Sequence, residues 1–431
     1  MTSLSPVTRE DVRWEPQRRR HAGRALPKYG TYHPAVPASI AELALDLSPS
    51  VLADAESASR EIARFDAELG GEIAPFASVL LRSESAASSQ IENLTASAGA
   101  IGEAELPGGK AKRNAALVVA NTAAMQAAIA LSDTVDADAI RAMHRALMVN
   151  DSRHTPGEFR TEPVWIGGGS TPIGATFVGP RHELITQAIS DLIAFAHRVD
   201  VPALPQIAVS HAQFETIHPF TDGNGRTGRA LVQAMLRNKA LTHQVTVPVS
   251  AGLLADTGAY FAALTSYRDG DAAPIVESFS QATILAIANG RQLVADLHEI
   301  RHGWNGVIAA RSDSAVWKVA DLLTRRPVVN AVLVAQELGI ESTNAHRYLN
   351  PLTKVGILIE TTNGPRNRVW RSPEVLAALD AFAERAGRRR GPTGDPVAGI
   401  RHHDAHRAPE PAVPRAAIGH LPVDQWGIAG S

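Results

Sequence analysis

The sequence has no cysteine, which excludes disulfides, thiolate metal sites and cysteine nucleophiles. It also has little net charge, because 42 Lys and Arg stand against 44 Asp and Glu, for a formal charge of −2. Overall charge therefore gives no case for nonspecific nucleic-acid binding. No apolar run is long enough to span a membrane, and residues 1–20 lack the apolar core of a secretory signal. We therefore expect a cytoplasmic protein without membrane association.

What is present describes an ordinary globular protein. Hydrophobic residues make up 45% and charged residues 20% of 431 residues, a length sufficient for two or three domains. Apolar periodicity predicts a mainly α-helical chain. The ranges expected to be helical are 40–69, 74–94, 115–131, 136–148, 183–197, 204–217, 226–238, 257–266, 273–301, 314–323, 328–338 and 342–355.

The most informative stretch is His218-Pro-Phe-Thr-Asp-Gly-Asn-Gly-Arg-Thr-Gly-Arg229. The run Gly223–Asn224–Gly225 is expected just ahead of a helix, whose first backbone N–H groups collect anions. Glycine lets the backbone approach a phosphate closely, because it has no Cβ. Arg226 and Arg229 lie at i and i+3 on one helix face and offer forked donors to phosphate oxygens. The stretch therefore predicts a phosphate-binding loop.

Two further residues of this stretch supply reactive chemistry. His218 can accept a proton near neutral pH. Asp222 is a hard oxygen ligand, placed to hold Mg2+ against bound phosphates. We therefore expect a nucleophile that loses its proton to His218 and attacks a phosphate held by the loop and the arginines.

This stretch matches the pattern HxFxDGNGRxxR and so resembles the signature of Fic-domain proteins, which are α-helical enzymes that mostly transfer AMP from ATP to a protein hydroxyl. The resemblance implies that His218 is the general base and Asp222 the Mg2+ ligand. It implies a nucleotide site made of Gly223, Asn224, Gly225, Arg226, Thr227, Gly228 and Arg229. An aromatic pair near the nucleotide in relatives suggests Tyr260 as a further contact, with core packing as the alternative.

The sequence Ser88-Ser-Gln-Ile-Glu92-Asn93 resembles the inhibitory motif (S/T)xxxE(G/N) of many Fic proteins. Ser88 and Glu92 are spaced to share one helix face. The resemblance implies that Glu92 pairs with Arg229 and prevents productive binding of ATP. The chemistry is plausible, since a carboxylate competes with a phosphate for one guanidinium. A solvated acid on a helix is the alternative.

Two short extended runs, 164–168 and 175–178, predict a β-hairpin with a glycine-rich tip. It resembles the Fic flap, which clamps the target's backbone beside the active site. The expected organisation is a Fic-associated segment over 1–70, an inhibitory helix region over 71–100, a catalytic core over 101–305, a winged helix-turn-helix over 312–372, and a disordered tail over 388–431.

The C-terminal helices are followed by a predicted hairpin over 357–361 and 368–370, with Asn363–Gly364 at its tip. Residues 313–371 carry eight Lys and Arg against five Asp and Glu. The candidate recognition helix presents Asn344, His346, Arg347 and Tyr348, and Arg366 and Arg368 lie on the wing. The module is expected to bind DNA, or alternatively to dimerise or dock a partner.

The leading functional prediction is a Mg2+-dependent protein adenylyltransferase that uses ATP, modifies a Tyr, Thr or Ser hydroxyl of a target or of itself, and is inhibited through Glu92. One alternative is a hydrolase that removes AMP, in which Glu92 orients a water. The other is a DNA-binding transcriptional regulator with an inactive Fic core, which the intact His218, Asp222 and arginines argue against. Each of these three functions leaves open whether the protein forms a homodimer.

Overall fold

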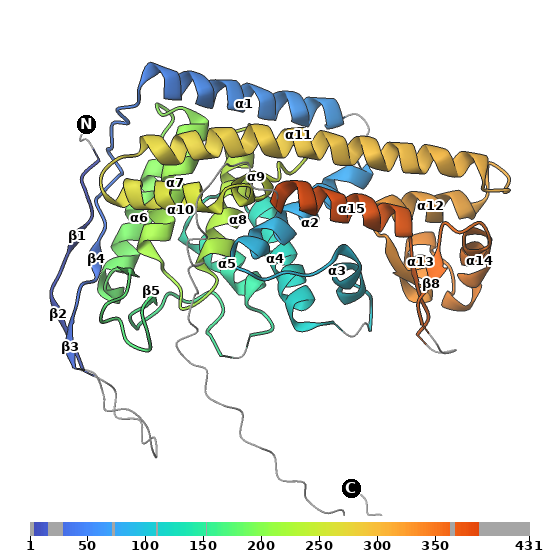
Figure 1. Ribbon diagram of the computed structural model, residues 1–431, viewed down its shortest axis with the longest axis horizontal. Coiled ribbons are helices and arrows are strands. Elements are labelled where there is room, and N and C mark those ends of the chain that lie inside the picture. Colours follow the sequence, from blue (N-terminus) through green and yellow to red (C-terminus); the bar gives the residue numbers. More distant parts are fainter. Residues whose placement is uncertain are drawn as a thin grey trace, which may run out of the picture.

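The computed structural model describes residues 4–15, 29–70, 74–108, 111–151, 153–362 and 367–387. The tail predicted over 388–431, the hairpin tip Asn363–Gly364 and Arg366 lie outside the described residues. Within them the chain is mainly helical, as expected (Figure 1). None of the described helices combines the length and the apolar character needed to cross a membrane.

The α-helices are α1 (Pro49–Gly70), α2 (Ala74–Ile91), α3 (Ala98–Ala104), α4 (Arg113–Ala130), α5 (Ala137–Leu147), α6 (Ile185–Ala196), α7 (Ala203–Ile217), α8 (Asn224–Asn238), α9 (Val249–Leu254), α10 (Thr257–Arg268), α11 (Ala273–Gly303), α12 (Ala315–Arg325), α13 (Ala331–Leu338), α14 (His346–Lys354) and α15 (Pro373–Gly387). Short 3-10 turns are η1 (His182–Leu184), η2 (Trp304–Gly306) and η3 (Ser342–Asn344).

The strands are short and antiparallel. They are β1 (Thr8–Arg9), β2 (Val12–Trp14), β3 (Gly30–Tyr32), β4 (Ala35–Val36), β5 (Trp165–Ile166), β6 (Phe177–Val178), β7 (Val328–Asn330), β8 (Ile359–Glu360) and β9 (Val369–Arg371). β1 pairs with β4 and β2 with β3, so part of the segment over 1–70, where no strand was predicted, is extended. β5 pairs with β6, which forms the predicted hairpin.

The core of the molecule is built around α7, which is buried on every side. Three of its polar side chains donate hydrogen bonds inside the fold: Gln206 to Phe195 O, Gln213 to Ala38 O and Thr216 to Ala212 O. Helix α8 packs against α7, and so does the long α11, which has α1 on its outer side (Figure 1). The turn between α7 and α8, which carries the motif, is thereby held between two buried helices.

The first helix starts later than predicted, at Pro49 rather than Ile40. Proline is favoured in the first turn of a helix because it lacks only an N–H that has no helical partner there. The Ser48 side chain accepts from Val51 N, which caps the start. Residues 40–48 are not helical, and the Asp191 carboxylate accepts from Ile40 N at 2.6 Å.

Two other expectations fail for local reasons. No helix was predicted over 99–114, but most of α3 lies there, and its start is capped by Ser97 Oγ accepting from Ala100 N. Residues 328–330 form a strand instead of the start of a helix, and Asn330 then caps α13 by accepting from Leu333 N. Short caps of this kind decide boundaries that apolar periodicity cannot place.

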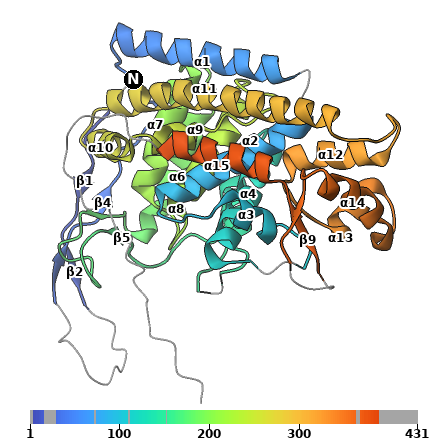
Figure 2. The same ribbon diagram turned by 45° about the vertical axis from the view of Figure 1, so that its right-hand side comes forward.

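The C-terminal module comprises α12, β7, α13, α14 and the strand pair β8–β9, in a sheet of order β7-β9-β8. The unpredicted α15 leaves this module and returns along α11 and across α2 (Figure 2). One hydrophobic cluster joins residues of α2, α11 and the module, including Phe76, Leu293 and Trp370. The module and the helix that carries Ser88 therefore share a core.

Candidate active site

The turn between α7 and α8 is shaped by left-handed backbone at both of its ends. His218 follows α7 with φ 50° and ψ 59°, and Gly223 precedes α8 with φ 72°. Asn224 closes the turn, since its Oδ1 accepts from Phe220 N and its Nδ2 donates to Phe220 O, both at 2.8 Å. Asn224 and Gly225 lie in the first turn of α8 rather than ahead of it, which corrects the predicted start at Arg226.

The start of α8 keeps the character of an anion site. The first N–H groups of a helix have no partner within it, and no side chain caps α8 among the described residues. The helix runs for 15 residues, so the positive end of its dipole adds to the attraction for a phosphate. The phosphate-binding loop predicted from the sequence therefore corresponds to the start of α8.

His144 packs against this turn, and it was not predicted from the sequence. Its ring stacks on Phe220 with 3.7 Å between centroids. Nδ1 accepts from Gly157 N at 2.9 Å, so Nε2 carries the proton and donates to Asp222 O at 3.1 Å. Burial lowers the pKa of His144 to about 4, which keeps the ring neutral. Nothing in the sequence marked this histidine, because its partners are main-chain groups.

His218 is largely buried and held in a defined tautomer. Its Nδ1 faces Glu215 O at 3.2 Å, and a carbonyl can only accept, so Nδ1 carries the proton and Nε2 is the basic nitrogen. The Glu215 carboxylate lies 3.9 Å from the same Nδ1. Burial raises the pKa of Glu215 to about 7, although Arg229 opposes the shift. Glu215 is thus a second ionisable group beside the expected base.

Arg160 ties the motif to the flap hairpin. Its Nε donates to His218 O at 2.8 Å and its Nη2 to Pro180 O at 2.6 Å, just beyond β6. Its own N–H donates to Pro219 O. Burial lowers its pKa to about 10, so the guanidinium stays charged. The position of the hairpin relative to His218 is therefore fixed by one buried side chain that the sequence did not single out.

Glu92 bridges the two motif arginines. Its Oε1 accepts from Arg229 Nη2 at 2.8 Å and its Oε2 from Arg226 Nε at 3.0 Å. Ser88 completes the contact, since Arg229 Nε donates to Ser88 Oγ at 2.9 Å and Nη2 to Ser88 O at 2.8 Å. Both guanidinium groups are buried. The carboxylate thus binds the donors that the resemblance assigns to phosphates.

The end of α2 explains how Glu92 reaches the arginines. The helix stops at Ile91, so Glu92 lies in the turn that follows and not on the helix itself. Asn93 has φ 61°, a left-handed conformation that asparagine adopts more readily than most residues. A Cβ at Gly225 would lie 2.3 Å from Glu92 Oε1, so a larger residue there would displace the carboxylate. Gly228 is similarly constrained by the Glu215 side chain, 2.6 Å from where a Cβ would lie.

Tyr260 and Thr227 do not lie at an open surface. Tyr260 is 1% exposed, and its hydroxyl is 2.7 Å from His211 Nε2. Burial raises its pKa, so it stays neutral. Tyr260 was predicted to contact a nucleotide, and its buried position does not fit that role. The residue packs behind Arg229, in agreement with the alternative of core packing. Thr227 is also fully buried, and its side chain packs inside the core.

Asp222 lies at the rim of the turn, where its carboxylate is 3.6 Å from Arg226 Nη2. Ligand atoms of Asp222, Asp151 and His154 all lie within 4.8 Å of one another. His154 Nδ1 also contacts Thr221 Oγ1, and Arg153 donates to Asp151 and holds the pKa of that carboxyl at about 2. Two carboxylates and an imidazole on partly exposed turns fit a divalent cation.

The start of α8, two buried arginines, His218 and a carboxylate suited to a metal form an arrangement that suits phosphoryl or nucleotidyl transfer. The comparisons make the assignment more specific. Residues 134–236 match the Fic/DOC family. The chain contains a Fic domain, within which His218 and the two arginines lie.

The curated relatives are similar over this domain. The protein adenylyltransferase fic-1 of Caenorhabditis elegans is 28% identical over 144 residues, which cover 33% of this chain and 26% of the relative. The protein adenylyltransferase Fic of Drosophila melanogaster is 28% identical over 142 residues, 33% of this chain and 26% of its own length. The alignments thus span about a quarter of each relative.

Solved structures of Fic proteins are also similar. A Fic family protein from Desulfovibrio desulfuricans has a TM-score of 0.49 and 21% identity, covering 76% of this chain and 97% of its own. Residues 134–508 of Fic-1 from C. elegans give a TM-score of 0.42 and 21% identity, covering 57% of this chain and 74% of that one.

Proposed function

We propose that this protein is an adenylyltransferase that transfers AMP from ATP to a Tyr, Thr or Ser hydroxyl of a target protein, and to itself, and that Glu92 inhibits it. The observation that carries the proposal is the double contact of Glu92 with Arg226 and Arg229 beside His218. The domain match and the names of the curated relatives support the reaction class.

In the proposed reaction, the target hydroxyl lies against His218. Nε2 is the basic nitrogen, because Nδ1 donates to Glu215 O. The hydroxyl gives its proton to Nε2 while its oxygen bonds to the α-phosphorus of ATP. The bond from that phosphorus to the β-phosphate oxygen breaks, and pyrophosphate leaves. The nearby Glu215 carboxylate, when ionised, stabilises the imidazolium that forms.

The remaining groups bind the nucleotide. The first N–H groups of α8 face the phosphates, and Arg226 and Arg229 bind the β- and γ-phosphates once Glu92 has moved. Asp222, with the Asp151 carboxylate beside it, would hold Mg2+, which takes oxygen ligands. When bound, that ion neutralises charge on the phosphate oxygens. His144 keeps the turn in place by holding Asp222 O.

Inhibition follows from competition for the same donors. The Glu92 carboxylate already neutralises both arginines in a buried setting, where its two bonds exclude phosphate oxygens. Glu92→Gly removes the carboxylate and suits the turn, so we expect AMP transfer to rise at least about tenfold, the equivalent of ~1.4 kcal/mol.

The test is incorporation of α-labelled ATP into protein, with Mg2+, by wild type, Glu92→Gly and His218→Ala. We expect strong label with Glu92→Gly, weak label with wild type and none with His218→Ala. Equal label with wild type and Glu92→Gly would disprove inhibition by Glu92. Label that persists in His218→Ala would disprove the role of the base.

Removal of AMP from a modified target is the competing activity of the same site. In that reaction Glu92 orients the attacking water and is required, whereas in transfer it is inhibitory. To distinguish hydrolysis from transfer, protein that carries labelled AMP is incubated with unlabelled wild type or with unlabelled Glu92→Gly. Loss of label that depends on Glu92 would assign hydrolysis.

We further propose that residues 312–372 form a winged helix that binds DNA. The order of α12, β7, α13, α14, β8 and β9 supports this. The exposed Asn344 in η3 and the exposed Arg347 at the start of α14 support it as well. On the wing, Arg368 is paired with Glu360 instead. Binding to DNA upstream of its own coding region should weaken as salt rises and fall further in Arg347→Glu. Binding equal to wild type in that variant would disprove it.

A further inference from the structure

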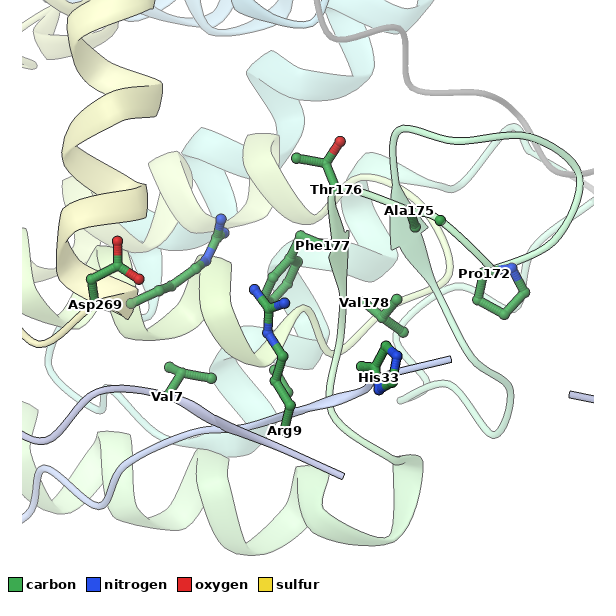
Figure 3. Close-up of a pocket in the computed structure, with 12 residues that line it drawn as sticks. Val7, Arg9, His33, Pro172, Ala175, Thr176, Phe177, Val178 and Asp269 are labelled. Carbon is green, nitrogen blue, oxygen red and sulfur yellow. The ribbon is translucent and has the colours of Figure 1, made fainter. Parts of the chain in front are cut away.

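A pocket lies between the flap and the N-terminal strands, outside the nucleotide site (Figure 3). It has a volume of about 100 Å3 and is formed by three separate parts of the chain. Arg9 and His33 come from the N-terminal strands, Thr176 and Phe177 from the flap, and Arg268 and Asp269 from the end of α10. No role in catalysis explains this convergence.

Arg268 gives the pocket a partly buried cation. Its guanidinium stacks on the Phe177 ring, 3.9 Å from the centroid, and Nη2 donates to Glu215 O at 3.3 Å. Its buried Nε has no hydrogen-bond partner among the described residues. A buried N–H of a charged group is costly to leave unpaired. The Arg268 guanidinium therefore keeps an unpaired donor beside the pocket.

Arg9 adds a second positive charge. Its side chain extends from β1 toward Phe177, with Asp269 on the other side of the pocket (Figure 3). Arg9 is exposed and forms no ion pair with any described residue. His33 is already bound to Asp11 at 2.8 Å. The pocket is lined by two arginines and one aspartate, Asp269, so its net charge is positive and suits a carboxylate.

The pocket also lies close to the catalytic base. Arg268 Nη2 and His218 Nδ1 donate to the same atom, Glu215 O, at 3.3 and 3.2 Å. The pocket and the imidazole are therefore on two sides of one carbonyl group. An extended chain advances about 3.3 Å per residue. A target segment lying along the flap with its hydroxyl at His218 can place a side chain within about three positions of that hydroxyl in the pocket.

We propose that this pocket selects the target by binding an Asp or Glu side chain within about three residues of the modified hydroxyl. The proposal rests on the proposed function, because it assumes a target segment beside His218. The carboxylate of the target pairs with Arg9 and lies against the positive charge of the Arg268 guanidinium. Phe177 and the N-terminal strands form the walls that orient it.

The test uses full-length Glu92→Gly and synthetic peptides with a central Tyr, or a central Thr, and one Glu placed at each position from −3 to +3. Peptides with Gln in place of Glu are the reference. At one position we expect the Glu peptide to have a kcat/KM about threefold to tenfold higher, the range for a partly exposed charged hydrogen bond. Equal values at every position would overturn the proposal.

Variants of Arg9 assign the preference to the pocket. In the Glu92→Gly background, Arg9→Gln should abolish the preference for Glu, Arg9→Lys should retain part of it, and Arg9→Glu should favour a Lys peptide. Arg13→Gln is the matched control, because Arg13 is an exposed arginine on the neighbouring β2 that does not line the pocket. A preference for Glu that survives in Arg9→Glu would overturn the assignment.

A binding measurement separates this inference from the proposed function. Fluorescently labelled versions of the same peptides are titrated with full-length Glu92→Gly/His218→Ala, in which no chemistry is expected. Tighter binding of a Glu peptide that depends on Arg9 supports the pocket even if no AMP transfer is found. Label on protein without any difference between Glu and Gln peptides supports the transferase and overturns the pocket.

Discussion

At the scale of single residues, Ser88 and Glu92 contact the same arginine by different means. Glu92 supplies charge, whereas Ser88 Oγ only accepts a hydrogen bond from Arg229 Nε at 2.9 Å. Ser88→Ala removes one acceptor and leaves the carboxylate in place. We therefore expect AMP transfer to rise by about threefold, well below the effect of Glu92→Gly, since a hydrogen bond to a charged group contributes ~1.5–3 kcal/mol and part of it is replaced.

The control for this prediction is Ser89→Ala. Ser89 is equally buried on α2, but its hydroxyl donates to Ser85 O and accepts from Asn121 Nδ2, away from the arginines. Labelled-ATP incorporation is measured for both variants. An increase in Ser89→Ala as large as in Ser88→Ala would show that loosening of α2, and not the contact with Arg229, relieves inhibition.

Residue types explain which parts of the site were predictable. The motif from His218 to Arg229 is local, and its histidine, aspartate and two arginines have chemistries that suit a proton, a metal and phosphates. Glu92 was assigned through the family resemblance, because its partners are more than 130 residues away. His144, Arg160 and Glu215 act through carbonyl groups or through burial, and neither leaves a pattern in the sequence.

At the scale of elements, Glu84 anchors α2 one turn before Ser88. Its buried carboxyl accepts from Ser250 N at 2.8 Å and Ser250 Oγ at 2.6 Å, at the start of α9. Burial raises its pKa from 4.5 to about 7, against the opposing effect of those bonds. Because the pKa of Glu84 is raised in the folded state, the contribution of Glu84 to the free energy of unfolding is full below pH 4.5. It is lost as the pH rises through 7.

The free energy of unfolding of wild type and Glu84→Gln should therefore diverge with pH. Between pH 8 and pH 5 we expect wild type to gain about 2 kcal/mol relative to the variant, because glutamine does not titrate. Denaturant titrations at several pH values measure this difference. Other groups such as Glu215 titrate in both proteins and cancel. Parallel curves for the two proteins would contradict a buried, titrating Glu84.

The element boundaries show where periodicity is insufficient. Long amphipathic or buried helices such as α4, α7 and α11 were predicted within a few residues. Errors occurred where one residue overrides the pattern, as Pro49 does at the start of α1 and Ser97 at the start of α3. The strands β1 to β4 are two or three residues long, too short to show an alternation. Their pairing depends on partners elsewhere in the chain.

At the scale of the whole molecule, the C-terminal module and the catalytic core share hydrophobic contacts. The cluster that contains Trp370 of β9 continues through α12 and α15 to Phe76 and Val79 of α2 and to Leu293 of α11. A module with a separate core would unfold on its own, whereas one continuous cluster couples the two parts. We therefore expect a single thermal transition for the intact chain.

Trp370→Ala tests this coupling. Trp370 is 1% exposed, so its truncation should cost about 3–5 kcal/mol. Ile359→Ala is the control on the same sheet, since Ile359 is 52% exposed and should change stability by no more than about 0.5 kcal/mol. Calorimetry should show that Trp370→Ala lowers the temperature of one common transition. A new low-temperature transition beside an unchanged main one would show that the module unfolds independently, and α2 would then keep Glu92 in place without it.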